Sequence, residues 1–211
     1  MKLLTAVILM LAVSVSWAGI GTVSDTKGTA CSIERNKQKL GGGKGEGVET
    51  NDTYVTAACQ ANITFKDDTK VKVTENSRLL IDDFVYDPKQ SDAGKLAMKV
   101  TMGTVRYASG QIAKNNPQQV NIKTPTAAIA VRGTDFVMAV DETGKSLVLL
   151  MPTCEENVQV VNLKGLVCGS GKIDVSANGH TVHLDKPYQA TVVGIDGDAP
   201  TLPMIVNLSN T

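Results

Sequence analysis

The candidate catalytic or metal-binding residues of this 211-residue chain are its two histidines, its adjacent carboxylates and its four cysteines. His180 and His183 are three positions apart, which puts them on opposite faces of a strand and argues against a shared metal ion. Asp67 and Asp68 diverge for the same reason, and we interpret them as solvated turn charges. No Gly-x-Ser-x-Gly or His-Glu-x-x-His pattern is present. The sequence therefore predicts no enzyme activity, no metal site and no cofactor.

The glycine-rich segment 41–47 contains Lys44 and invites comparison with a phosphate-binding loop. In such a loop the glycines expose backbone N–H groups to an anion, and a serine or threonine follows the lysine. Here Gly45 follows Lys44, and no helical periodicity comes after the segment. We interpret the segment as a solvated connection between strands.

Four cysteines in an exported chain predict two disulfides. Three pairings are possible, and we favour Cys31 with Cys59 and Cys154 with Cys168, because each pair brackets a loop-like segment between strand-like runs. Each bridge would stabilise the fold by roughly 3 to 4 kcal/mol in the chain-entropy model. A four-cysteine metal site is the alternative, but the sequence has no Cys-x-x-Cys pair.

Export is predicted by the N-terminus, where Lys2 precedes an apolar run at 3–15 and small residues occupy Ser16 and Ala18. This composition is typical of a secretory signal peptide that is cleaved after Ala18. The residue directly after the cleavage site is Gly19 and not a cysteine, so we expect no lipid anchor. The apolar run is short for a membrane helix, and no later run reaches about twenty apolar residues. We therefore expect no membrane span after cleavage.

The sequence predicts that these residues lie on short β-strands and the turns between them. Aromatic residues are few, Gly, Thr and Val are frequent, and turn clusters such as 66–69, 74–77 and 87–94 recur at short intervals. No window has a clear helical period. The expected strands are 29–35, 54–65, 70–73, 78–86, 95–102, 104–108, those within 120–140, 147–151, 157–162, 172–176, 181–184, 190–193 and a last one at 204–206.

The longest run of β-branched and small apolar residues is 120–140, which is interrupted only by Pro125 and Gly133. Pro125 fits a strand edge or a corner, and Gly133 is predicted to be a bulge or corner. Arg132 is a cation between two apolar strands. We interpret its stem as packed and its guanidinium as bound to carbonyls or to a carboxylate such as Asp135, with a ligand-anchoring arginine as the alternative.

The order Thr-Pro-Thr-Ala at 124–127, then Val-Arg-Gly-Thr-Asp-Phe at 131–136, resembles the FecR domain, a periplasmic sensor module named after the iron-dicitrate regulator. Segments 61–69 and 96–105 are similar to the family's strand with an acidic turn and to its strand-glycine-strand segment. The similarity runs from about Thr50 to about Val161. It implies a β-solenoid-like stack of short strands, with a β-sandwich as the alternative. The residues that carry the family motif are Thr124, Pro125, Arg132, Gly133, Thr134, Asp135 and Phe136.

We divide the chain into a signal peptide (1–18), an N-terminal extension with a first strand and the glycine-rich loop (19–49), a FecR-like domain (50–161) and a C-terminal β extension and tail (162–211). Regulators of this family also need a cytoplasmic segment, a membrane span and a receptor-binding domain. We expect instead a stand-alone exported form in the periplasm.

The resemblance implies a non-enzymatic module that binds a periplasmic or membrane protein, as a sensor accessory or scaffold. Binding to a cell-wall or surface polysaccharide is the alternative, which an exposed aromatic cluster would favour. Lys plus Arg number 21 and Asp plus Glu also number 21, so charge gives no reason to expect nucleic acid as a partner.

Overall fold

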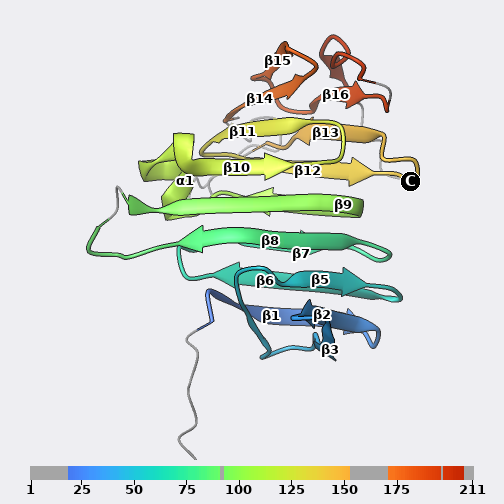
Figure 1. Ribbon diagram of the computed structural model, residues 1–211. Coiled ribbons are helices and arrows are strands. Elements are labelled where there is room, and N and C mark those ends of the chain that lie inside the picture. Colours follow the sequence, from blue (N-terminus) through green and yellow to red (C-terminus); the bar gives the residue numbers. More distant parts are fainter. Residues whose placement is uncertain (1–18, 91–92, 153–170, 196, 207–211) are drawn as a thin grey trace, which may run out of the picture.

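The computed structural model of the protein describes residues 19–90, 93–152, 171–195 and 197–206. In this part of the chain strands follow one another, and the helical elements α1 (Gln111–Asn115) and the 3-10 helix η2 (Pro117–Gln119) are short, as is the 3-10 structure at Ala93. The prediction of an all-β fold is therefore confirmed (Figure 1). The predicted signal peptide, the strand at 157–162 and the Cys154–Cys168 pairing lie outside the described residues. No helix of the described ranges is long and apolar enough to cross a membrane.

Hydrogen-bonded strands form two runs, which we call sheet A and sheet B. Sheet A has the order β4 (Gly47–Val48), β1 (Gly21–Gly28), β6 (Cys59–Phe65), β7 (Lys70–Val73), β9 (Lys95–Ala108), β12 (Asp135–Val140), β13 (Ser146–Leu150), β16 (Gln189–Val193) and β17 (Met204–Ile205). Sheet B has the order β3 (Gln38–Gly41), β2 (Cys31–Arg35), β5 (Thr53–Thr56), β8 (Arg78–Val85), β9, β10 (Val120–Lys123), β11 (Ala128–Arg132), β14 (Lys172–Ala177) and β15 (His180–Leu184).

Strand β9 belongs to both sheets and joins them. Its first half pairs with β8 and β10 in sheet B, and its second half pairs with β7 and β12 in sheet A. Near the change of sheet, Gly103 has a φ of +82°, and a Cβ there would lie 2.1 Å from the Oγ of Ser77. Only glycine fits such a backbone and such a close approach. Through β9 the two runs form one open mixed sheet, in which the β9–β10 pair is parallel.

The inward side chains of both sheets meet in one buried cluster. Buried positions alternate with more exposed ones along β6 and β8, so that Ile63 and Leu79 are fully buried while their neighbours in the chain are more exposed. The rings of Phe65 in sheet A and Phe84 in sheet B have centroids 5.5 Å apart. The two sheets therefore pack face to face, and the core lies between them.

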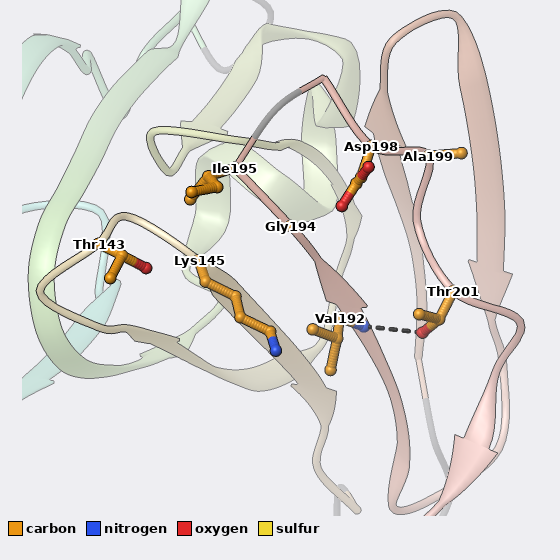
Figure 2. A pocket seen from close by; sticks show the side chains of 8 residues that line it. All are labelled: Thr143, Lys145, Val192, Gly194, Ile195, Asp198, Ala199 and Thr201. Carbon is orange, nitrogen blue, oxygen red and sulfur yellow. Dashed lines mark hydrogen bonds between the residues drawn. The ribbon is translucent and has the colours of Figure 1, made fainter.

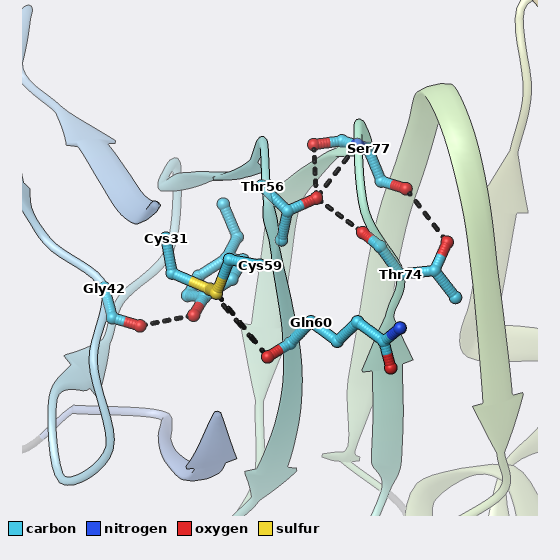
Figure 3. The surroundings of a disulfide bond; sticks show 8 residues. Cys31, Gly42, Thr56, Cys59, Gln60, Thr74 and Ser77 are labelled. Carbon is cyan, nitrogen blue, oxygen red and sulfur yellow. Dashed lines mark hydrogen bonds between the residues drawn. A yellow bond between two sulfur atoms is a disulfide. The ribbon is translucent and has the colours of Figure 1, made fainter. Parts of the chain in front are cut away.

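A disulfide between Cys31 of β2 and Cys59 of β6 links sheet B to sheet A at the N-terminal end (Figure 3). This confirms the first predicted pairing. Next to it, the hydroxyl of the buried Tyr54 donates a hydrogen bond to the carbonyl of Gly42, and burial raises the pKa of Tyr54 to about 12. Gly42 lies in the glycine-rich segment, which connects β3 to β4 as predicted.

Strands of the two sheets share successive heights along the molecule. In Figure 1, β1 lies level with β2, β6 with β5, β7 with β8, β12 with β10, and β13 with β11. The chain thus proceeds from the N-terminal end to the C-terminal end while it alternates between the sheets. Strands β14 to β16 lie at the far end, beside the strands that carry the family motif.

One turn differs from the interpretation made from sequence. Asp67 is fully buried rather than solvated, and its carboxylate accepts hydrogen bonds from the backbone N–H of Thr69 at 3.0 Å, from the Thr69 hydroxyl at 2.8 Å and from the N–H of Ile112 at 3.2 Å. Asp68, next to it, is exposed with a φ of 65°. Asp67 therefore ties the β6–β7 turn to α1, a contact between segments that are distant in the sequence.

Candidate functional site

The first half of the family motif forms the turn between β10 and β11. The N–H of Thr124 donates to the carbonyl of Ala127 at 2.9 Å, and the N–H of Ala127 donates to the Thr124 hydroxyl at 3.0 Å. The buried Ser146 of β13 donates to the Thr124 hydroxyl at 2.8 Å and accepts from the hydroxyl of Thr126 at 2.8 Å. These bonds fix the turn of sheet B onto sheet A, and Pro125 lies at a corner as predicted.

The second half of the motif forms the corner between β11 and β12. Gly133 has a φ of +60°, in the left-handed region that favours glycine, and it carries the chain from sheet B to sheet A. The N–H of Thr134 donates to the hydroxyl of Ser109 at 2.9 Å, and that hydroxyl donates to the Thr134 carbonyl at 2.8 Å. Phe136 is fully buried, with its ring centroid 5.2 Å from that of Tyr107. The corner predicted at Gly133 is therefore confirmed and firmly held.

Asp135 binds Arg106 of β9 and not Arg132. The Nε of Arg106 donates to Oδ1 of Asp135 at 3.0 Å, and its Nη2 donates to Oδ2. These hydrogen bonds to Asp135 raise the pKa of Arg106. The expectation that Asp135 could pair with Arg132 is wrong, because the Gly133 corner sends the two side chains to the outer faces of different sheets.

Arg132 reaches into solvent. Its side chain is 69% exposed, and the carboxylate within reach is Asp174 of β14, with Nη2 and Oδ2 3.7 Å apart. The expectation of a packed stem is therefore wrong as well. In the register of β11 and β14, Arg132 stands directly opposite Lys172. Two cations in directly opposite positions repel each other.

A hollow of about 410 Å³ lies over this end of sheet B. Within it the Nδ1 of His183 lies 2.6 Å from the Oδ1 of Asp174. His180 is not among the residues that line it, in keeping with the spacing of the two histidines. Guanidinium, ammonium and imidazole groups can bind an anionic group by charge and hydrogen bonding. The residues that line the hollow are Arg132, Lys172, Asp174, His183, Leu184 and Asp185.

A second pair of cations lies on the same outer face. Lys99 of β9 and Lys123 of β10 are in direct register, and Lys123 stands opposite Ala128 at the start of β11. Ala128 and Arg132 both point outward and are four residues apart, so the two pairs are separated by about 13 Å along the strand. Among the described residues, no carboxylate forms an ion pair with Lys99, Lys123 or Lys172. We call the outward surface that carries Lys99, Lys123, Arg132 and Lys172 the cationic face.

The family can now be assigned. Residues 52–153 match the model of the FecR protein family, and this range includes both halves of the motif. The chain carries a FecR domain. The match confirms the resemblance inferred from the motif and from the segments at 61–69 and 96–105.

Comparison with whole proteins adds little beyond the FecR match. No curated protein sequence matches the chain. Two crystal structures of a candidate anti-sigma factor from Parabacteroides distasonis match with 15% and 14% sequence identity, each with a TM-score of 0.47. Each match covers 70% of this chain, which spans 56% of the solved chain.

The FecR match contributes only part of the cationic face. Lys99, Lys123 and Arg132 lie within it, whereas Lys172 and Asp174 belong to β14, beyond its end. Sequence reasoning missed these β14 residues as neighbours of Arg132. Alternation along 172–176 marks Lys172 as outward, but nothing local shows that β14 pairs with β11. Whether the motif residues bind a partner stays a prediction.

The outer face of sheet A in the FecR domain has a larger hollow, of about 620 Å³, with Lys70, Lys72, Arg106 and Asp135 in its lining. Lys72 stands directly opposite Arg106 in the β7–β9 pairing. Here, however, Asp135 neutralises Arg106. Sheet A therefore has a counterpart of the cationic face in which the arginine, but not Lys70 or Lys72, is bound to a carboxylate.

A third hollow, of about 470 Å³, is formed mainly by β16 and the residues that follow it. Figure 2 shows Lys145 and Asp198 on opposite sides of it, while the N–H of Val192 donates to the Thr201 hydroxyl at 3.0 Å. Its opposite charges and its place beside the β12–β13 turn, where Thr143 lies, distinguish it from the cationic face.

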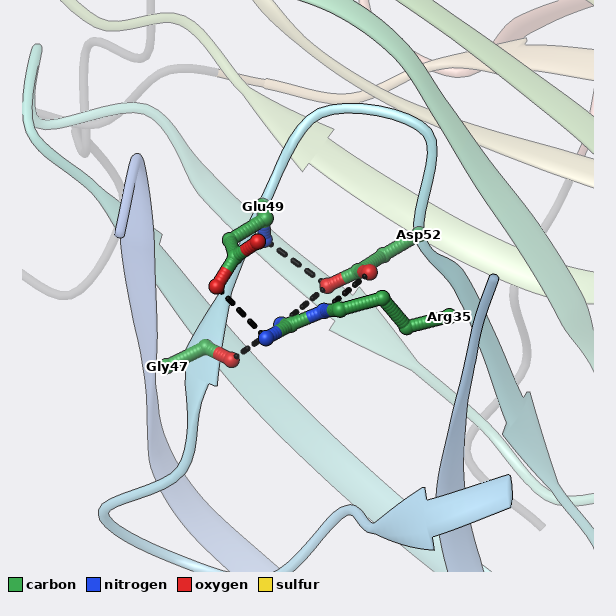
Figure 4. A network of polar contacts seen from close by, with 4 residues as sticks. All are labelled: Arg35, Gly47, Glu49 and Asp52. Carbon is green, nitrogen blue, oxygen red and sulfur yellow. Dashed lines mark hydrogen bonds and ion pairs between the residues drawn. The ribbon is translucent and has the colours of Figure 1, made fainter. Parts of the chain in front are cut away.

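Close to the start of the FecR match, one arginine is fully held (Figure 4). Arg35 donates from Nε and Nη2 to the two carboxylate oxygens of Asp52, both at 2.7 Å, and from Nη1 to Glu49 at 2.5 Å. Asp52 is fully buried, and its hydrogen bonds raise the pKa of Arg35. We interpret this cluster as structural, because its charged groups pair with one another.

Proposed function

We propose that this protein is an exported, non-enzymatic FecR-domain module that binds a periplasmic or membrane protein and acts as an accessory or scaffold in signalling. The FecR match supports a role in signalling. The Cys31–Cys59 disulfide supports export, because such bonds persist in oxidising compartments.

The cationic face is the observation that carries this proposal. Its charges stand on paired strands, which hold them in fixed positions, and they have few partners within the described chain. Charge patterns of this kind steer and orient a charged partner. A binding role fits these groups better than catalysis, which would need a base held against a nucleophile.

Polysaccharide binding, the alternative, has less support. It would need aromatic rings stacked in the open, yet Tyr54 and Tyr107 are buried and Phe84 is 7% exposed. Tyr86 packs beside Phe84, with ring centroids 6.5 Å apart. Tyr188 is more exposed but belongs to the segment between β15 and β16. The described aromatics therefore favour a protein partner.

For the architecture, we propose the solenoid-like stack rather than the sandwich. The support is that strands of the two sheets share successive heights and that the chain as a whole moves from the N-terminal end to the C-terminal end, with one step back where β12 returns to the height of β10 (Figure 1). A Greek-key sandwich would instead return strands from one end of a sheet to the other.

In-cell crosslinking of the full chain, followed by mass spectrometry, tests the proposed function. We expect a membrane receptor or sensor protein among the captured species, and none when an unrelated exported protein carries the crosslinker. Capture of nothing but the chain itself, together with co-sedimentation on isolated cell wall, would contradict the proposal and favour polysaccharide binding.

A further inference from the structure

We propose that the cationic face of sheet B is the docking surface for an acidic segment of the partner protein, with Arg132 and Lys172 as its main contacts. This inference rests on the proposed function and adds the location of the interface and the chemistry of the partner.

In the free protein, the cations of the cationic face repel one another within each pair. Lys99 faces Lys123, and Arg132 faces Lys172, each in direct register across neighbouring strands. Like charges in such positions destabilise a sheet. Asp174 offsets this repulsion only in part, since its Oδ2 is 3.7 Å from Arg132 while its Oδ1 lies 2.6 Å from His183. An added carboxylate at each pair would remove the repulsion.

The geometry also sets the spacing of the ligand groups. Ala128 and Ala130 are outward and exposed between the two pairs, and their short side chains leave the surface open there. An extended peptide rises by about 3.3 Å per residue, so residues i and i+4 are about 13 Å apart and point the same way. The two pairs are also offset by two strands across the sheet, but Lys123 and Arg132 are offset by only one, which places them about 14 Å apart. A segment with acidic residues at i and i+4 that crosses from β10 to β11 therefore reaches one cation of each pair.

Sheet A has a second pair of cations in register, which serves for comparison. Lys72 and Arg106 also stand in register there, but Asp135 binds Arg106 through two nitrogens. The same motif supplies the carboxylate that binds Arg106 of sheet A, whereas Arg132 of sheet B has the looser ion pair with Asp174, at 3.7 Å. The outer face of sheet A therefore provides a matched control surface with Lys70 and Lys72.

The test is fluorescence anisotropy on the disulfide-bonded chain from residue 19, at low salt. The probe is a labelled twelve-residue peptide with Glu at positions i and i+4 in an otherwise uncharged sequence. Binding should weaken with added salt, and a peptide with Gln in place of Glu should not bind. Replacing both Arg132→Gln and Lys172→Gln should weaken binding about five- to tenfold, whereas Lys70→Gln with Lys72→Gln, an equal change in charge, should leave it within about twofold.

Three results would overturn the inference. The first is no binding of the Glu peptide at low salt, and the second is an equal loss with the control pair of variants. The third is tighter binding of polygalacturonate, an anionic polysaccharide, with the same dependence on Arg132 and Lys172. Thermal melting of both double variants would show that each is folded.

In-cell crosslinking with the Arg132→Gln, Lys172→Gln chain separates this inference from the proposed function. Loss of the captured partner supports the cationic face as the interface. Undiminished capture means that the module binds its partner through another surface, so the function stands and the inference fails. Peptide binding in vitro without any captured partner in cells would support the face and contradict the proposed function.

Discussion

Two arginines of the FecR domain, Arg106 on sheet A and Arg132 on sheet B, stand on outward positions of their strands but differ in what holds them. Arg106 donates hydrogen bonds to Asp135, whereas Arg132 is 69% exposed and, among the described residues, pairs with Asp174 at 3.7 Å. Asp135 is three residues from Arg132 in the chain, and the corner at Gly133 gives it to the other sheet. The two faces thus differ in how closely a carboxylate holds the arginine: Asp135 is bound to Arg106 through two nitrogens, whereas Asp174 is 3.7 Å from Arg132.

Arg35, at the N-terminal end, is a third arginine for this comparison, and it is hydrogen-bonded to a buried carboxylate. Removing that carboxylate should lower the free energy of unfolding more than any other change considered below. Asp52→Ala removes a fully buried carboxylate that accepts two hydrogen bonds from Arg35 and one, at 2.7 Å, from the N–H of Glu49. We expect the free energy of unfolding to fall by about 3 kcal/mol, because the guanidinium loses its partner in a partly buried site. Equilibrium unfolding in urea measures this. A loss below about 1 kcal/mol would mean that the cluster is not structural.

Asp135→Asn is the next largest change, and it should make sheet A resemble sheet B. Arg106 is half exposed, so we expect the free energy of unfolding to fall by only about 1 kcal/mol. The variant leaves Lys70, Lys72 and Arg106 without a carboxylate, and we expect it to gain affinity for the acidic peptide on that face. Asp174→Asn is the matched change on sheet B. If Asp135→Asn gains no peptide affinity, uncompensated charge alone does not make a binding face.

Replacing Arg132→Gln and Lys172→Gln together should have a small effect of opposite sign. Removal of two like charges in direct register should raise the free energy of unfolding by a few tenths of a kcal/mol. Denaturant unfolding at low and high salt is the measurement, since screening should abolish the gain. A loss of 2 kcal/mol would instead restore the packed role of Arg132 that the sequence alone suggested.

The sequence was a good guide wherever a feature depends on neighbours in the chain. Alternation of apolar and polar residues located most strands, Pro125 and Gly133 marked the corners, and the loop between Cys31 and Cys59 indicated their disulfide. The most specific part of the FecR resemblance, at 131–136, is a run of consecutive residues and could be recognised without knowledge of the fold.

What the sequence did not show depends on which strands become neighbours. Asp67 looked like a solvated turn charge because its partner Ile112 is 45 residues away. Arg132 was expected to pair with Asp135 because the two are close in the sequence. The sequence indicated a corner at Gly133, but it did not show that the chain passes from sheet B to sheet A there. Lys172 entered the candidate site only through the pairing of β11 with β14, which no local pattern encodes.

The smallest expected effect concerns Asp141, a carboxylate held by its own turn rather than by a cation. It accepts hydrogen bonds from the Thr143 hydroxyl at 2.6 Å, the Thr143 N–H at 2.9 Å and the Lys145 N–H at 3.0 Å, and these bonds lower its pKa. A lowered pKa means that the charged form favours the folded state. This contribution is therefore complete above the ordinary carboxyl pKa and is lost as the pH falls through the lowered value.

Thr143→Val should raise the pKa of Asp141 toward its ordinary value, because the hydroxyl is the strongest of these donors. Side-chain NMR titration is the suitable measurement, since Asp141 is exposed and the melting temperature will change little. Thr143→Ser, which keeps the hydroxyl, is the matched control and should leave the pKa low. An unchanged pKa in Thr143→Val would mean that the backbone N–H groups suffice. The turn would then hold its carboxylate with backbone donors alone, in contrast to Asp135, which is held by the side chain of Arg106.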